Sequence, residues 1–103
     1  MKVWMDGELL DAANAAINVY DHGLLYGDGV FEGIRVYNGR IFKAVQHVDR
    51  LFDGARAIRL AIPMSKQAVL DAMAATLAAN GTKDGYIRLV ATRGDGTLGL
   101  NPF

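Results

Sequence analysis

The alternation of side chains over residues 29–37 predicts a β-strand with two unlike faces. One face holds Val30, Glu32, Ile34 and Val36, and the other holds Phe31, Gly33, Arg35 and Tyr37. Successive side chains of a strand point to opposite sides, so neither face of this strand is purely apolar. We therefore expect each face to contact something besides hydrocarbon.

Two turn dipeptides, Asp6-Gly7 and Asn38-Gly39, predict β-hairpins. Both accept the positive backbone angles of a two-residue turn whose twist matches that of its strands. The predicted strands are residues 3–5 and 8–10 around the first turn, residues 29–37 and 40–42 around the second, and residues 86–92 near the end of the chain.

The spacing of apolar residues predicts two helices. In the first helix, apolar residues recur three or four apart at Val48, Leu51, Phe52, Ala55 and Ile58. Ser65 can cap the start of the second helix and Gly81 its end, with an apolar stripe of Val69, Met73, Thr76 and Leu77 between them. This order of elements predicts an α+β fold, a mainly antiparallel sheet with two helices on one side. The other side of the sheet then needs an occupant.

Composition narrows the possible partners. The 103 residues form one domain at most and carry 11 basic and 11 acidic side chains, so no global basic field favours nucleic acid or an anionic membrane. No apolar run approaches the length that crosses a membrane, and we expect a soluble, cytoplasmic protein. Cysteine is absent and His22 and His47 are the only histidines, so we expect no metal site.

The segment DHGLLYGDGVFEGIR, residues 21–35, combines glycines, charges and aromatic residues in a way that an ordinary core strand does not. We interpret it as part of a functional site. Gly27 and Gly29 flank Asp28, which predicts a turn through backbone angles that favour glycine.

A glycine pattern follows the last predicted strand at Gly94, Gly96 and Gly99. Its G-x-G-x-x-G spacing is that of a dinucleotide-binding loop, but that loop must lead into a helix, and here Pro102 and the end of the given sequence follow. A glycine-rich active-site loop is the better interpretation.

Three further residues are candidates for binding anions. Arg50 lies off the apolar stripe of the first helix, close to His47, and is either a solvated arginine or a clamp for phosphate or carboxylate. Tyr86 and Arg88 share one strand face, so they could together recognise a carboxylate, or Arg88 could form a cross-strand salt bridge with Glu32.

In these motifs the sequence resembles the N-terminal domain of the class IV (fold-type IV) pyridoxal-phosphate enzymes, most closely the branched-chain amino acid aminotransferases. The matching segments are VWMDGELL, DHGLLYGDGVFEGIRVYNGRIF, HVDRL and GYIRLVATRGDGTLGLNP, which together cover nearly the whole chain in the family's order. The resemblance implies that residues 1–103 form the small domain of a homodimeric, pyridoxal 5'-phosphate-dependent transaminase.

The resemblance also implies roles for single residues. Arg50 matches the arginine that binds the cofactor phosphate, and the substrate-binding positions are matched by Tyr26, Phe31, Gly33, Tyr86 and Arg88. Arg88 would pair with the distal carboxylate of glutamate, the amino donor, and Tyr86 would help to hold the substrate carboxylate. Asp28, Glu32 and Arg35 are expected to have only structural roles, as a buried charge pair.

The family's Schiff-base lysine has no counterpart in this sequence. That lysine belongs to the second domain, and none of Lys2, Lys43, Lys66 and Lys83 has its sequence context. We therefore expect no catalytic residue in this chain and no transamination by the chain alone. The sequence is expected to be interrupted at Phe103, with the second domain missing.

The predicted function of the full-length protein is amino-group transfer between branched-chain L-amino acids and 2-oxoglutarate. D-amino acid transaminases of the family carry Arg-x-His where this sequence has Leu98-Gly99-Leu100, which favours the branched-chain type. A D-amino acid transaminase or an aminodeoxychorismate lyase is the alternative within the family. A non-catalytic module that binds an anion or a protein partner is the alternative of another class.

Overall fold

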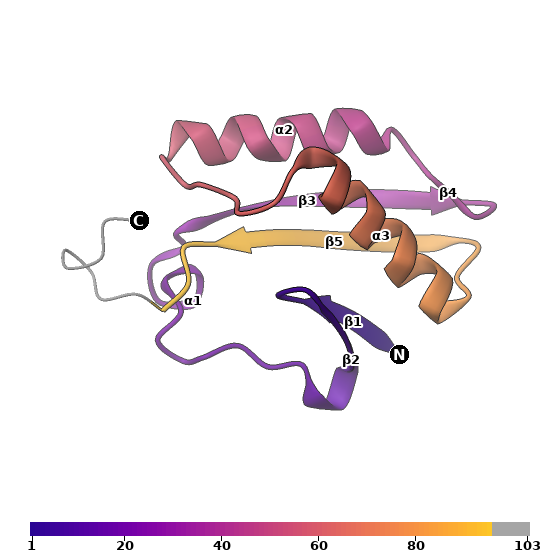
Figure 1. Ribbon diagram of the computed structural model, residues 1–103, viewed down its shortest axis with the longest axis horizontal. Coiled ribbons are helices and arrows are strands. Elements are labelled where there is room, and N and C mark those ends of the chain that lie inside the picture. Colours follow the sequence, from indigo (N-terminus) through magenta and orange to yellow (C-terminus); the bar gives the residue numbers. More distant parts are fainter. Residues whose placement is uncertain (96–103) are drawn as a thin grey trace.

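The computed structural model describes residues 1–95, and their elements confirm the predicted α+β architecture. Two sheets and three α-helices are present in that part of the chain (Figure 1). In chain order the elements are β1 (Lys2–Met5), β2 (Glu8–Asp11), a 3-10 turn (Ala12–Asn14), α1 (His22–Tyr26), β3 (Gly29–Tyr37), β4 (Arg40–Ile41), α2 (Ala44–Ala57), α3 (Lys66–Asn80) and β5 (Gly85–Thr92).

The strands pair as two antiparallel sheets. β1 and β2 form one sheet, and the other has the order β4-β3-β5. Both predicted hairpin turns are confirmed, because Asp6 and Asn38 have φ of 50° and 51° and are each followed by a glycine of positive φ. This is the backbone geometry that Asp-Gly and Asn-Gly adopt in tight hairpins.

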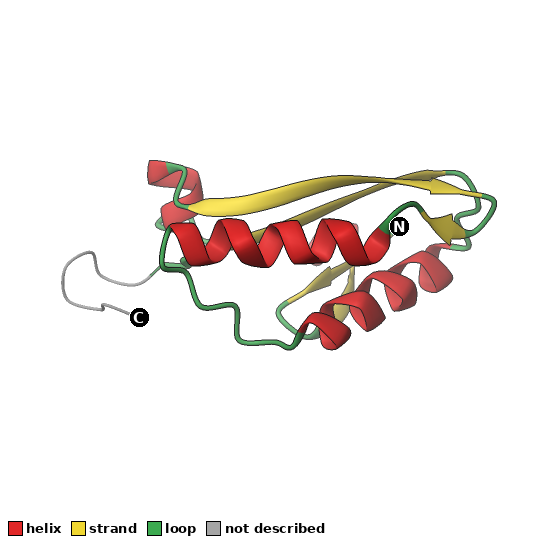
Figure 2. Cartoon of the chain, turned by 90° about the horizontal axis from the view of Figure 1, so that it is seen from above, coloured by secondary structure: helices red, strands yellow, loops and turns green. Residues whose placement is uncertain are grey.

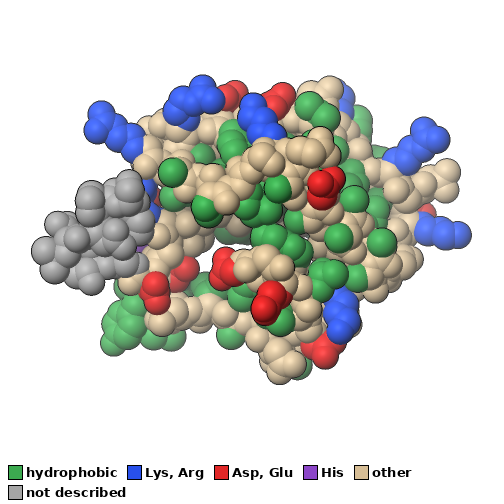
Figure 3. Space-filling view, viewed as in Figure 1, with side chains coloured by type: hydrophobic (Ala, Val, Ile, Leu, Met, Phe, Trp, Pro, Cys, Tyr) green, Lys and Arg blue, Asp and Glu red, His purple; other side chains and the backbone are tan. Residues whose placement is uncertain are grey.

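Both long helices cover the same face of the three-stranded sheet (Figures 1 and 2). The core between them joins Ile34 of β3, Val48 of α2, and Val69 and Met73 of α3, all buried. On this side of the molecule, hydrophobic side chains gather over the middle and Lys and Arg side chains project at the periphery (Figure 3). The apolar stripes predicted for the two helices therefore face the sheet, as expected.

The ends of α3 also agree with the sequence pattern. Ser65 Oγ accepts a hydrogen bond of 3.0 Å from the Ala68 N–H. Gly81 follows the helix with φ of 60°, which is the left-handed geometry of a C-terminal cap. The side chain of Asn80 bonds both polar backbone groups of Lys2, which attaches α3 to the β1 strand.

The helix α1 was not predicted from the hydrophobic pattern. It is only five residues long, less than two turns, so an apolar period has no room to repeat. Its local signals are present nevertheless, because Asp21 Oδ1 accepts from the Gly23 N–H at 2.7 Å and Gly27 ends the helix with φ of 66°. An aspartate and a glycine separated by one short turn could have indicated it.

The expectation for Gly29 was wrong, since its φ is not among the positive values of the described chain. Glycine is instead required for close approach, because a Cβ at this position would lie 2.7 Å from the Ala91 carbonyl oxygen on β5. The first residue of β3 therefore pairs tightly with the end of β5.

Candidate functional site

The face of the three-stranded sheet opposite the helices is open and carries four of the predicted site residues. Phe31 and Gly33 lie on this face of β3, and Tyr86 and Arg88 lie on the same face of β5. The antiparallel register places Gly33 directly opposite Arg88. Phe31 and Tyr86 are 58% and 53% exposed, so this face presents aromatic surface that a ligand can contact.

Glycine at position 33 makes room for the ring of Tyr86. A Cβ added to Gly33 would meet the Tyr86 hydroxyl and would lie 2.9 Å from Cζ of the same ring. The phenol therefore lies across β3, with its hydroxyl above the strand instead of at the sheet edge. The Tyr86 ring can pack against β3 in this way only because residue 33 has no side chain.

The guanidinium of Arg88 lies over the ring of Phe31, with Cζ 4.2 Å from the ring centroid. A cation over an aromatic face is attracted by the ring's negative quadrupole, and the stacking leaves the donor N–H groups at the rim of the guanidinium available. The alternative of a cross-strand salt bridge between Arg88 and Glu32 is wrong, because Glu32 points to the other face of the sheet and is buried there. Arg88 is thus oriented for an anion from outside.

Tyr26 lies apart from this cluster, at the end of α1 just before β3 begins. Tyr26 is 61% exposed, and its ring meets the ring of His22 edge-on, with centroids 5.4 Å apart. The structure therefore brings together four of the five residues predicted to bind substrate and places the fifth next to the start of the same strand.

Arg50 of α2 is bound to a buried carboxylate on the helix-covered face. Its Nε lies 3.1 and 3.0 Å from the two carboxylate oxygens of Glu32, and its Nη2 lies 2.9 Å from Oε1. His47 Nδ1 lies 2.7 Å from the same Oε1. The hydrogen bond from Arg50 is the main reason that the pKa of Glu32 falls below its ordinary value, and the His47 contact lowers it further.

The structure shows how far Arg50 is exposed and what holds it. Its side chain is 72% exposed, as a solvated arginine would be, while the guanidinium is held by Glu32. Within residues 1–95, Nη1 of Arg50 has no hydrogen-bond partner, so this side of the guanidinium is open to a ligand. That arrangement suits a phosphate, which accepts several N–H donors at once.

Arg50 and the Phe31–Arg88 cluster thus lie on opposite faces of the sheet, a relation that strand alternation alone predicts for residues 31 and 32. The edge of β3 separates them. β4 pairs with Val36 and Tyr37, and the Phe42 N–H donates to the Arg35 carbonyl oxygen, so no described strand covers the edge of β3 from residue 29 to residue 34. The helix α2 runs alongside this edge (Figure 1).

A second ion pair, between Asp28 and Arg93, joins the start of β3 to the end of β5, at one end of the ladder that these strands form. Arg93 Nε lies 2.6 Å from Asp28 Oδ2, and the Arg93 hydrogen bond is the main cause that lowers the pKa of Asp28. The Nη groups of Arg93 also donate to the Ile58 and Arg59 carbonyl oxygens at 2.7 and 3.1 Å. Sequence reasoning missed this pair, since its members are 65 positions apart.

The expected buried charge pair among Asp28, Glu32 and Arg35 is therefore corrected. The two acids pair with Arg93 and Arg50, and Arg35 is exposed. Arg35 belongs to the outward-facing side of β3, so it cannot reach a carboxylate that is buried beneath the helices.

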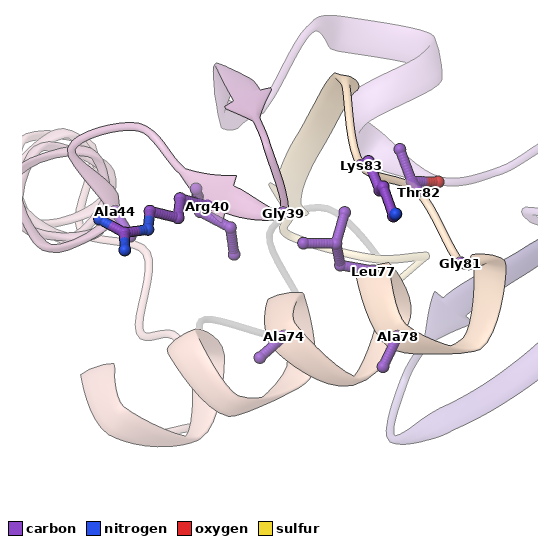
Figure 4. A pocket seen from close by; sticks show the side chains of 10 residues that line it. Gly39, Arg40, Ala44, Ala74, Leu77, Ala78, Gly81, Thr82 and Lys83 are labelled. Atoms are coloured by element: carbon purple, nitrogen blue, oxygen red, sulfur yellow. The ribbon is translucent and has the colours of Figure 1, made fainter.

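An open hollow of about 660 Å³ lies between the β3–β4 turn and the end of α3 (Figure 4). Its residues are Gly39, Arg40, Ile41, Ala44, Ala74, Leu77, Ala78, Gly81, Thr82 and Lys83. None of the predicted site residues lines it, and it contains no carboxylate or histidine. It is separate from the candidate site.

The sequence also led us to expect no metal site and no membrane-spanning segment. In residues 1–95, no three His, Cys, Asp or Glu side chains come together as a metal site would require. No helix in that range has the length and apolar character needed to cross a membrane. The Leu98-Gly99-Leu100 segment and the end of the predicted glycine-rich loop lie outside the described residues.

Replacing Gly33 with alanine is expected to lower the free energy of unfolding by about 1 kcal/mol, because the added methyl group collides with Tyr86. Urea unfolding followed by circular dichroism measures this. The cost should disappear when Tyr86 is already alanine. An equal loss in both backgrounds would show that the glycine is required for another reason.

The chain is similar to known proteins of one family. The model of the Amino-transferase class IV family matches residues 29–103. A putative branched-chain-amino-acid aminotransferase of Methanocaldococcus jannaschii is 50% identical over 102 residues, which are 99% of this chain and 35% of that protein. A D-alanine aminotransferase of Listeria monocytogenes is 37% identical over 94 residues, which are 91% of this chain and 32% of that protein.

A solved structure shares the fold. It is a branched-chain amino acid aminotransferase from the organism abbreviated T.th., complexed with N-(5'-phosphopyridoxyl)-L-glutamate. It superimposes with a TM-score of 0.90 at 35% identity, covering 98% of this chain and 35% of that one. This chain therefore spans about a third of the length of the relatives that it matches.

Proposed function

The chain belongs to the class IV aminotransferases, and we propose that it forms the N-terminal small domain of a branched-chain amino acid aminotransferase. In this proposal a second domain supplies the Schiff-base lysine, and this chain supplies one wall of the active site. The observation that carries the proposal is the Arg88 guanidinium stacked on Phe31, beside the Tyr86 hydroxyl that lies over Gly33. These groups form a carboxylate-binding surface next to exposed apolar rings.

The residues of this chain fit pyridoxal 5'-phosphate at one point, the phosphate. Arg50 is exposed, carries a fixed positive charge and has Nη1 directed away from its partner Glu32. When bound, pyridoxal phosphate supplies the electron sink that allows an amino group to leave one carbon skeleton and join another. Arg50 would hold the phosphate beside the uncovered edge of β3.

The substrate would lie on the open face. Arg88 would bind the distal carboxylate of glutamate, because a guanidinium recognises a carboxylate through two parallel hydrogen bonds. Tyr86 would donate its hydroxyl proton to a substrate carboxylate, and Phe31 would contact the branched hydrocarbon side chain. Tyr26, next to the start of β3, would border the same pocket near the cofactor phosphate.

The partners in this proposal are small molecules, namely branched-chain amino acids and 2-oxo acids. We place the protein in the cytoplasm as a homodimer, without nucleic acid or membrane partners. The balance of 11 basic and 11 acidic side chains supports the absence of the last two. Exposed apolar residues of the segment before β3, among them Ile17, Val19 and Leu24, support association with further protein surface.

D-amino acid transamination is the second candidate, and the D-alanine aminotransferase relative favours it. Assay of the full-length protein with pyridoxal phosphate distinguishes the two. We expect amino transfer from L-leucine to 2-oxoglutarate and none from D-alanine. Turnover of D-alanine alone would replace the branched-chain assignment, and a protein that binds the cofactor but transfers no amino group would support the lyase or a non-catalytic module.

A further inference from the structure

We infer that Glu32 is a positioning residue for the phosphate site: its buried carboxylate sets the orientation of the Arg50 guanidinium. The inference rests on the proposed function, because it assumes that Arg50 meets the cofactor phosphate. Glu32 is a residue for which the family resemblance led us to expect only a structural role.

The hydrogen bonds to Glu32 engage one side of the guanidinium and leave the other side open. Nε and Nη2 of Arg50 face the carboxylate at 2.9–3.1 Å. A guanidinium is planar and rigid, so holding this edge also fixes the direction of the opposite donors on Nη1. A solvated arginine would otherwise lose considerable rotamer freedom on binding a ligand. The hydrogen bonds to Glu32 restrict the Arg50 rotamer before a ligand binds.

The place of Glu32 in the core argues against a purely structural role. Its neighbours on the same strand face, Ile34 and Val36, are 0% and 1% exposed, and Glu32 itself is 6% exposed. Burying a carboxylate costs free energy that its partners must offset, and an apolar residue of similar size is often at least as stabilising in such a place. A charged residue here therefore indicates a task that hydrocarbon cannot perform.

His47 completes the arrangement from one turn earlier on α2. Its Nδ1 lies 2.7 Å from Oε1 of Glu32, the oxygen that also meets Arg50 Nη2. Two contacts from one helix hold the carboxylate, so its own rotamer is fixed relative to α2. The strand, the helix and the open donors of Arg50 thus form one rigid unit.

The test compares two ligands that differ only in the phosphate, pyridoxal 5'-phosphate and pyridoxal, by equilibrium dialysis against the full-length protein. We expect Glu32→Gln to weaken binding of pyridoxal 5'-phosphate by about tenfold, because a charge-assisted hydrogen bond is replaced by a weaker neutral one. Binding of pyridoxal should stay unchanged. Arg50→Gln should also weaken binding of pyridoxal 5'-phosphate without affecting pyridoxal, and by a larger factor than Glu32→Gln. Asp53→Asn, which removes an exposed carboxylate from the same helix, should change neither.

The outcomes separate the possible explanations. Equal weakening of both ligands by Glu32→Gln would indicate general damage to the fold and would overturn the inference, as would unchanged binding of pyridoxal 5'-phosphate. If that variant does not fold, Glu32→Asp decides, since it keeps the charge, withdraws the carboxylate by one methylene and should show a smaller loss of the same selectivity. Failure of the unaltered protein to bind either ligand would overturn the proposed function itself.

Discussion

Replacing Arg88 with glutamine is expected to lower kcat/KM for glutamate roughly 10- to 100-fold, the effect of losing a charged hydrogen-bonding partner. The guanidinium is already oriented by the Phe31 ring at 4.2 Å, so a carboxylate binding there meets ordered donors. Glutamine keeps a polar side chain but cannot make the charged, two-pronged contact. Steady-state kinetics of the full-length protein with glutamate and 2-oxo acids measure the loss.

L-leucine provides the internal comparison, because it has no distal carboxylate. Its kcat/KM should fall by much less than that of glutamate in the Arg88→Gln protein. Arg56→Gln, a change of an exposed arginine on α2, should leave both values as they are. Equal losses for the two amino acids would mean that Arg88 supports the site in general and does not recognise the distal carboxylate.

Replacing Ile34 with alanine should lower the free energy of unfolding by about 2–5 kcal/mol, the range for emptying a filled core position. Ile34 is 0% exposed and lies where β3 meets Val48 of α2 and Met73 of α3. Removing three carbons there leaves a cavity between the sheet and both helices. Urea unfolding followed by circular dichroism gives the change.

Two further variants show whether burial is the cause. Ile34→Val removes a single methyl group and should cost about 0.5–1.5 kcal/mol. Val45→Ala shortens an apolar residue of α2 that is 56% exposed, and should stay within about 0.5 kcal/mol of the unaltered chain. A loss at Val45 as large as that at Ile34 would contradict the core assignment.

Local chemistry explains why so much of the fold could be predicted. The alternation over residues 29–37, the Asn38-Gly39 turn and the Ser65 and Gly81 caps each act within a few residues, and all appear in the structure. The helix α1 escaped because five residues hold too little of a helical period to stand out.

The candidate site could be predicted only in part, because its decisive contacts join distant segments. The alternation of side chains along a strand predicts that Tyr86 and Arg88 share a face. The Arg88–Phe31 stack depends on the register between β3 and β5, which no local pattern reveals. The partner of Arg50 likewise depends on how α2 crosses β3. One signal was available, since Glu32 interrupts an otherwise apolar strand face, and a charge in such a place predicts a buried partner.

The Asp28–Arg93 pair has a consequence for how this end of the domain opens. Arg93 holds the start of β3, the carbonyl groups just after α2 and the end of β5, and its own N–H donates to the Asp28 carbonyl oxygen at 3.1 Å. The N–H of His22 also donates to Gly94. Segments tied by one side chain cannot fray separately, so their amide protons should exchange with solvent in a single cooperative step. The contacts of Arg93 therefore stabilise one end of the strand pair that carries Phe31 and Arg88.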